Sequence, residues 1–174
     1  MKKLSLPSIS IALLFACHGT AQAGTVTGTI GATIILEKAC AMNGTSNATD
    51  LNMGSLNFGT HSALFTSANA TLTTTSNGAV TVECSNDANG TLTIGNGLHD
   101  SNAGTNHHAM KFGTNYVPYD LVTKVKNVLI PHGGTATITG GTGPFGVDIT
   151  GTAHGKLNLA PGTYTDTISV TLAF

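Results

Sequence analysis

The sequence predicts an all-β protein of the sandwich type, and three observations support this prediction. Short runs rich in Val, Ile and Thr recur between clusters of Gly, Asn and Ser, at a spacing typical of sandwiches. No long segment repeats its apolar residues with the period of a helix. Two segments, residues 25–36 and 164–174, alternate apolar and polar side chains, which is the pattern of a half-buried strand.

Residues 1–23 have the three parts of a secretory signal peptide. A start with two lysines precedes an apolar segment at residues 4–16, and an A-x-A cleavage site ends at Ala23. We therefore expect export and a mature chain that begins at Gly24. We expect no stable membrane insertion, because no segment approaches the roughly 20 apolar residues that a membrane helix needs. An alternative is a lipoprotein cleavage box that ends at Cys17, which would then carry a lipid.

Residues 25–36 are expected to form a strand with one apolar face at the start of the mature chain. The positions of that face are Val26, Gly28, Ile30, Ala32, Ile34 and Leu36. Thr and Gly occupy almost all positions between them. Two interpretations stay open on the residues alone: the strand is the first strand of its own domain, or it is donated to a groove on another copy.

The mature residues suit one domain with a single modest core. Cys40 and Cys84 remain after either cleavage, and in an exported chain we expect them to form a disulfide. The chain has no Arg and no Trp, and its formal net charge is −1. It therefore offers no basic patch for nucleic acid.

Further strands are expected between turn signals along the chain. The expected strands cover residues 24–37, 49–58, 70–75, 79–84, 90–94, 116–124, 128–139, 145–152 and 164–174. Asn77-Gly78 and Asn89-Gly90 predict hairpin turns, and residues 140–144 predict a break in the chain. Residues 95–111 are rich in Gly, Asn and His and predict a long surface loop.

The last alternating strand is expected to leave an open sheet edge. Its apolar face comprises Tyr164, Ile168, Val170, Leu172 and Phe174. Because nothing follows this strand in the sequence, we expect an edge or groove beside it. Residues 25–36 of another copy would fill such a groove by strand addition.

Four segments resemble segments of a known family. They are Leu56-Asn57-Phe58-Gly59, Val80-Thr81-Val82-Glu83-Cys84, Tyr116-Val117-Pro118-Tyr119-Asp120-Leu121 and Ala160-Pro161-Gly162-Thr163-Tyr164-Thr165-Asp166-Thr167-Ile168-Ser169-Val170-Thr171. Over nearly all of the mature chain the sequence resembles the spore coat protein U domain family, which includes subunits of archaic, Csu-type chaperone-usher pili. It departs from the family pattern at residues 106–110, Asn-His-His-Ala-Met, where relatives often carry arginine.

The resemblance implies an incomplete immunoglobulin-like sandwich that lacks its final strand. It implies three parts: a signal peptide at residues 1–23, a donor-strand extension at residues 24–38 and a pilin domain at residues 39–174. A periplasmic chaperone and an outer-membrane usher would handle the subunit, and the extension of another pilin subunit would complete its sheet. The implied function is that of a structural subunit of an extracellular pilus or fimbria that supports adhesion and biofilm formation.

Two other classes of function remain open. A secreted or outer-membrane-anchored adhesin, or a spore or cell coat component, would bind a surface through residues 95–111 without polymerising. A secreted hydrolase would need convergent polar groups, and the sequence shows no G-x-S-x-G motif, P-loop or Cys/His nucleophile arrangement. We therefore expect no enzymatic activity and no cofactor.

Charged and metal-binding side chains give weaker signals. His99, His107 and His108 are candidate metal ligands, but their spacing fits no metal motif, and we expect them to be loop residues without a metal. We expect Asp166 to cap local backbone near the last strand. A pair of catalytic carboxylates could be drawn from four aspartates, but no periodicity brings any two of them together: Asp100, Asp120, Asp148 and Asp166.

Overall fold

The computed structural model describes residues 24–73 and 80–174. The predicted signal peptide, Cys17 and the predicted Asn77-Gly78 turn lie outside these residues. Internal contacts divide the chain into two units, Met1–Ile35 and Leu36–Phe174. Residues 24–35, the described part of the first unit, contain no helix or strand, so the strand predicted there is not formed within this chain.

The second unit is all-β, and its strands form two antiparallel sheets. The larger sheet contains β1 (Cys40–Met42), β2 (Ser55–Leu56), β3 (Ser67–Thr73), β4 (Val80–Cys84), β6 (His108–Phe112), β7 (Asn115–Val125), β8 (Val128–Ile130) and β10 (Phe145–His154). The smaller sheet contains β5 (Asn89–Gly97), β9 (Thr135–Thr139) and β11 (Ile168–Ala173). A short 3-10 helix, η1 (Asp100–Asn102), is the one helical segment in the described part of the chain, which has no helix able to cross a membrane.

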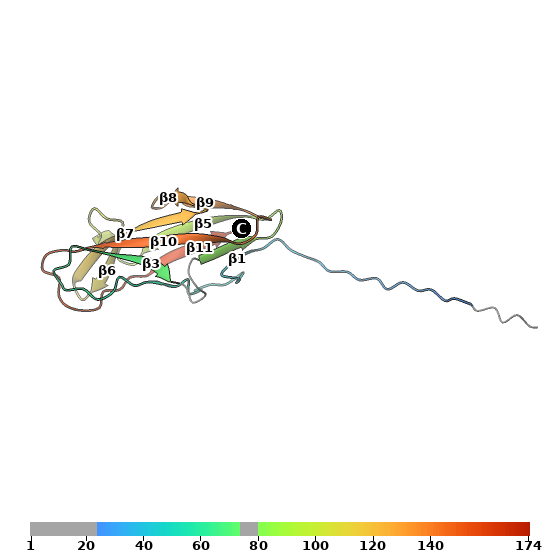
Figure 1. Ribbon diagram of the computed structural model, residues 1–174, viewed down its shortest axis with the longest axis horizontal. Helices are drawn as coiled ribbons and strands as arrows, with labels where there is room; N and C mark the ends of the chain where they lie inside the picture. Colours follow the sequence, from blue (N-terminus) through green and yellow to red (C-terminus); the bar gives the residue numbers. More distant parts are fainter. Residues whose placement is uncertain (1–23, 74–79) are drawn as a thin grey trace, which may run out of the picture. The chain divides into compact units, whose positions relative to one another are not determined.

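Strand β10 is the centre of the larger sheet (Figure 1). On one side it pairs with β7, from Val147 opposite Val125 to Ala153 opposite Tyr119. On the other side it pairs first with β4 and then with β3. β1 and β2 lie outside β4 and β3, while β6 and β8 lie outside β7.

Strand β5 is the centre of the smaller sheet, between β11 and β9. Leu92 of β5 is opposite Leu172 of β11 on one side and Ala136 of β9 on the other. Among the described residues β11 has no other strand as a partner. Its second side is therefore a sheet edge.

Side chains that alternate along both sheets meet in one main core. Val82 and Val147 of the larger sheet and Leu92 and Ile138 of the smaller sheet are at most 2% exposed and belong to one apolar cluster. The pattern along β4, in which every second side chain is buried, shows how strand alternation directs one face inward. This burial between two sheets confirms the all-β, two-layer prediction.

The expected disulfide between Cys40 and Cys84 is present within this core. The two cysteines face one another across β1 and β4. Gly90 at the start of β5 lies against them: a Cβ added to it would come within 3.2 Å of Cys40 Sγ and 3.3 Å of Cys84 Sγ. Gly90 therefore allows close packing on the disulfide, and the prediction that it forms a hairpin turn is wrong.

The turn before β5 lies a few residues earlier than predicted. The Ala88 N–H donates to the Ser85 carbonyl at 3.1 Å, and Asp87 has a positive φ of 61°. The predicted break at residues 140–144 is confirmed between β9 and β10, where Gly141 and Gly143 both have positive φ.

Residues 128–139, predicted as one strand, form two strands that belong to different sheets. β8 ends at Ile130 and β9 begins at Thr135. Pro131 has no N–H to donate to a ladder, and its carbonyl accepts the Gly134 N–H at 2.9 Å. The chain therefore turns at Pro131 and crosses between the sheets.

Residues 49–58, predicted as one strand, contain only the two residues of β2. The Asn52 side chain accepts the N–H of Gly54, and the Asn57 side chain accepts the N–H of Gly59, each at 2.9 Å. These local bonds compete with a strand ladder for the same backbone groups. The other predicted strands of the second unit are found with shifted ends.

The prediction of a surface loop at residues 95–111 is wrong. The segment contains the end of β5, η1 and the first part of β6. Ala103, His108 and Ala109 are buried in it. Gly, Asn and His are common in loops. Here, however, the side chains of Asn106, His107 and His108 have hydrogen-bond partners within the fold.

Candidate functional site

The predicted donor residues expose their apolar side chains. All six are exposed in the structure: Val26, Gly28, Ile30, Ala32, Ile34 and Leu36. Val26 and Ile30 are 99% and 98% exposed. Ile35, which lies on the opposite face of the predicted strand, is also exposed, so the donor register remains a prediction.

Strand β11 combines an unpaired edge with an apolar face. Ile168, Val170 and Leu172 are half-buried and alternate with exposed residues, as the sequence pattern predicts. Tyr164 and Phe174, also placed on this face by the sequence, lie outside the strand, and Phe174 is 53% exposed.

A cavity of about 190 Å³ lies between the edge strands of the two sheets. Strand β1 ends the larger sheet and β11 ends the smaller one. The residues that line the cavity are Cys40, Met42, Thr45, Asn47, Ala48, Leu51, Leu172 and Phe174. The two layers therefore leave room for apolar side chains where both present an edge.

Asp166, just before β11, is the centre of a buried polar cluster. Its Oδ1 accepts the Leu98 N–H at 3.0 Å and lies 3.1 Å from Nδ1 of His99. Its Oδ2 accepts the hydroxyl of Tyr119 at 2.8 Å, and its side chain is 2% exposed. The prediction of a local cap is wrong, because the capped backbone group lies 68 residues away in the sequence.

The environment keeps Tyr119 protonated. Burial, the hydrogen bond to Asp166 and the nearby negative charges of Asp166 and Asp100 raise the pKa of Tyr119 well above its ordinary value. The phenol therefore acts as a hydrogen-bond donor to the buried carboxylate.

Asp100 and His108 form a hydrogen-bonded pair beside this cluster. Nδ1 of His108, a residue that is 1% exposed, lies 3.0 Å from Asp100 Oδ1. Asp100 Oδ2 accepts the Gly97 N–H at 2.8 Å. One donor atom each of Asp100, His108 and Asp166 lies within 4.8 Å of the other two. The fold therefore brings Asp100 and Asp166 together, although no sequence periodicity relates them.

Asp120 on β7 is the centre of a more exposed cluster. Its Oδ2 accepts the Asn106 amide at 2.6 Å and lies 3.0 Å from His154 Nε2. Its Oδ1 accepts the His107 N–H at 3.1 Å and lies 2.9 Å from His107 Nδ1. Burial raises the pKa of Asp120, but the hydrogen bonds from Asn106, His107 and His154 outweigh it and hold the pKa below the ordinary value of 3.8.

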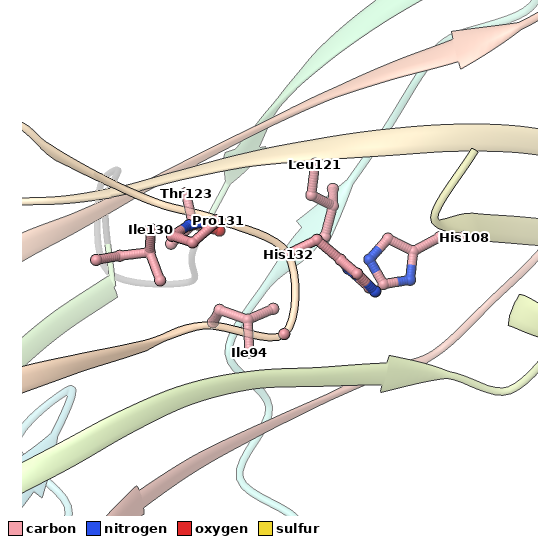
Figure 2. Close-up of a pocket in the computed structure, with 8 residues that line it drawn as sticks. Ile94, His108, Leu121, Thr123, Ile130, Pro131 and His132 are labelled. Atoms are coloured by element: carbon pink, nitrogen blue, oxygen red, sulfur yellow. The ribbon is translucent and has the colours of Figure 1, made fainter. Parts of the chain in front are cut away.

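His132, from the turn between β8 and β9, adds a third imidazole beside His107 and His108. The ring centroid of His132 lies 4.3 Å from that of His107 and 5.1 Å from that of His108. Figure 2 shows the rings of His132 and His108 side by side at a cavity of about 10 Å³, which is about the space of one water molecule. Burial and repulsion by His107 and His108 lower the pKa of His132.

Sequence reasoning placed three of these histidines in one loop but did not find their partners. His99, His107 and His108 each contact an aspartate from another part of the chain or from a neighbouring turn. No spacing rule connects them to groups on β7, β10 or the β8–β9 turn. The partners that the sequence missed are Tyr119, His132 and His154.

Fold and site together define an all-β protein with two antiparallel sheets, a disulfide at a sheet edge and an exposed apolar N-terminal segment. The chain belongs to the Spore Coat Protein U domain family, whose model matches residues 26–171. The resemblance seen in its four sequence segments is thus confirmed.

Two known proteins are similar to this chain. Protein U of Myxococcus xanthus is 25% identical to this chain over 185 residues, which cover 99% of this chain and 98% of that protein. A crystal structure of the CsuC-CsuE chaperone-tip adhesion subunit pre-assembly complex, from archaic chaperone-usher Csu pili of Acinetobacter baumannii, matches with a TM-score of 0.43 and 19% identity. That match covers 80% of this chain and 40% of the solved chain.

Proposed function

We propose that this chain is a structural subunit of an extracellular pilus, in which residues 25–36 of one copy complete the sheet at β11 of another. Residues 1–23 are its signal peptide, residues 24–38 its donor-strand extension and residues 39–174 its pilin domain. Its partners are other pilin subunits, a periplasmic chaperone and an outer-membrane usher, as the family resemblance implies. The filament supports adhesion and biofilm formation, and the subunit has no enzymatic role.

The observation that carries the proposal is the open edge of β11 beside a cavity. β11 pairs only with β5 among the described residues, and the cavity beside it is bordered by the edge strand β1 of the other sheet. An exposed strand edge is a template for another strand, because its backbone groups lack partners. An added strand would form a ladder with β11 and place alternate side chains between the sheets.

The exposed N-terminal residues supply a strand of the required chemistry. Val26, Ile30, Ile34 and Leu36 alternate with residues that are mostly Thr and Gly. Burying four such side chains at about 1.5 to 3 kcal/mol each is favourable by roughly 6 to 12 kcal/mol before the cost of ordering the segment. In the described part of the chain these apolar side chains are exposed.

A subunit with both a donor segment and an acceptor edge builds a filament. The donor of one copy contacts a different surface on the next copy, so the interface is heterologous and does not close on itself after two copies. A subunit with an uncovered apolar edge is also prone to aggregate, which accounts for the need of a chaperone before assembly.

The two faces of the donor segment provide the test. Ile30→Asp places a charge on the apolar face, while Thr29→Asp places the same charge on the opposite face of a segment that is exposed throughout. We expect Ile30→Asp to weaken subunit joining about 10- to 100-fold, the equivalent of one lost apolar side chain. Filaments seen by electron microscopy and ladders on unboiled gels would measure assembly, and equal loss for both variants would contradict the register.

The wild-type chain also separates the proposal from its alternative. A coat component or adhesin that does not polymerise would leave the exported protein as a monomer on unboiled gels, with no filaments in the microscope. That result would contradict the proposal whatever the variants do.

A further inference from the structure

Three side chains of the types that ligate metals come from distant parts of the sequence and meet at one place in the second unit. Asp100 belongs to η1, His108 begins β6 and Asp166 precedes β11. One donor atom of each lies within 4.8 Å of the other two. In a tetrahedral zinc site the donor atoms are about 3.4 Å apart, given metal–ligand distances near 2.1 Å. The side chains therefore need only a small closure to surround an ion.

The burial of these groups calls for positive charge. The Asp166 side chain is 2% exposed, His108 is 1% exposed and the Asp100 side chain is 20% exposed. Within residues 24–73 and 80–174, the ion-pair partners of the two carboxylates are histidines, with no lysine among them. Two carboxylates that are close together and removed from water repel one another and are costly to desolvate. A bound cation offsets both costs.

Gly97 at the end of β5 gives the two carboxylates their space. A Cβ added to Gly97 would collide with Asp166 Oδ2 and would come within 2.7 Å of Asp100 Oδ1. Its backbone N–H also donates to Asp100 Oδ2 at 2.8 Å. The absence of a side chain at this position therefore lets both carboxylates reach the same small volume.

We propose that Asp100, His108 and Asp166 bind one divalent ion of the zinc class. Two carboxylate oxygens and one imidazole nitrogen form a donor set that zinc and neighbouring first-row ions accept. The ion takes the place of the proton between Nδ1 of His108 and Asp100 Oδ1, and that proton moves to Nε2, so the imidazole stays neutral. The inference does not depend on the proposed function, because it concerns residues outside both the donor segment and β11.

Surrounding groups are placed to orient these ligands. Tyr119 and the Leu98 N–H donate to Asp166, and His99 lies beside the same carboxylate. Such outer contacts fix the direction of a ligating carboxylate. Nε2 of His108 has no hydrogen-bond partner among the described residues, and Figure 2 shows it directed toward His132 and the small cavity. With the ion on Nδ1, Nε2 carries the proton and donates it to a water molecule in that cavity.

The bound ion would connect three elements. It links η1, which follows β5, to the first residue of β6 and to the segment that leads into β11. These elements belong to both sheets, so the ion acts as a cross-link at this end of the sandwich.

Zinc titration of the full exported chain tests the proposal, with Asp100→Asn and Asp120→Asn as a matched pair. Each substitution removes one carboxylate charge that contacts histidine, but only Asp100 belongs to the proposed site. We expect one Zn²⁺ per chain by calorimetry, at least about a tenfold loss of affinity in Asp100→Asn and little change in Asp120→Asn. Loss in Asp120→Asn alone would assign the ion to the exposed cluster and overturn the proposal.

Spectroscopy of the wild-type chain keeps the test valid if a variant does not fold. Co²⁺ added in place of Zn²⁺ should give the intense visible absorption of a tetrahedral site with nitrogen and oxygen ligands. Zn²⁺ should shift the ¹⁵N resonance of His108 Nδ1 and move the imidazole proton to Nε2. The absence of stoichiometric binding, or an unchanged His108 resonance, would show that these residues form only a hydrogen-bonded network.

Discussion

The two segments with alternating apolar side chains differ in structure: β11 is a paired strand, whereas residues 25–36 are exposed and form no strand. In both, the residues between the apolar positions are mostly Thr, Ser or Gly. β11 pairs with β5 and half-buries Ile168, Val170 and Leu172. Residues 25–36 form no strand in the structure and expose Val26 and Ile30 almost completely.

The difference teaches that alternation defines an apolar face but not the partner that covers it. β11 gains its partner because Leu172 and Val170 pack against the core formed by both sheets. Residues 25–36 have the same local preference without a described strand beside them. Local pattern thus identifies a segment with an apolar face, whereas the formation of a strand and the surface that covers its face depend on contacts that the pattern does not encode.

Deleting each segment should give the largest contrast. Removal of residues 24–37 should leave the unfolding midpoint of the domain nearly unchanged and abolish the ability of the chain to act as a donor. Removal of residues 168–174 should prevent stable folding, because it removes Val170 and Leu172 from the core cluster. Circular dichroism and incorporation into wild-type filaments measure the two effects. Normal donation by the first truncation would contradict the strand-exchange proposal.

The disulfide is next in expected magnitude, and it lies where the exposed segment ends and the sandwich begins. Cys40 and Cys84 close a loop with a sequence separation of 44. Replacing both by Ser should lower the free energy of unfolding by about 4 kcal/mol in the chain-entropy model. Denaturant titration of the oxidised wild type and the double variant checks this value. A loss below about 1 kcal/mol would show that the loop contributes little to stability, and the reduced wild type is the matched control.

The same substitution in the two segments should separate folding from assembly. Leu172→Asp puts a charge on the half-buried face of β11 and should destabilise the domain by about 2 to 3 kcal/mol. Ile30→Asp, at a residue that is 98% exposed, should leave the free energy of unfolding within about 0.5 kcal/mol of wild type. Thr171→Asp, on the exposed face of β11, is the control for Leu172→Asp. Destabilisation of the isolated subunit by Ile30→Asp would indicate that residues 25–36 pack on their own domain.

Features that depend on local chemistry were predictable from the sequence. The alternation in β4, β10 and β11 reflects burial of one strand face. The pairing of Cys40 with Cys84 was predicted from the expected export and from the two cysteines that remain after it. The strand at residues 128–139 was predicted too long because its β-favouring residues continue past Pro131, where the chain changes sheet.

The polar cluster was not predictable, because its members meet only through the fold. Asp166 contacts Leu98, His99 and Tyr119, which come from two other parts of the chain. Gly97 shows why composition is a poor guide here: it ends a strand and makes space for two carboxylates, although Gly within residues 95–111 indicated a loop. Such a site requires knowledge of which strands are neighbours.

The smallest expected effect is that of acid on the free energy of unfolding. Residues 25–36 contain no titratable side chain, whereas the sandwich contains Asp120. Because the folded-state pKa of Asp120 lies below its ordinary value of 3.8, its hydrogen bonds stabilise the fold fully above that value. This contribution is lost as the pH falls through the lowered pKa.

At pH 6 the free energy of unfolding of the wild type should therefore exceed that of Asp120→Asn, by no more than about 1 kcal/mol for such a partly exposed group. Near pH 3 the two values should approach one another. Urea titrations at both pH values measure the difference, and Asp148→Asn, at an exposed residue without a described side-chain hydrogen bond, is the control. A constant gap between wild type and Asp120→Asn would mean that the aspartate acts through its shape rather than its charge.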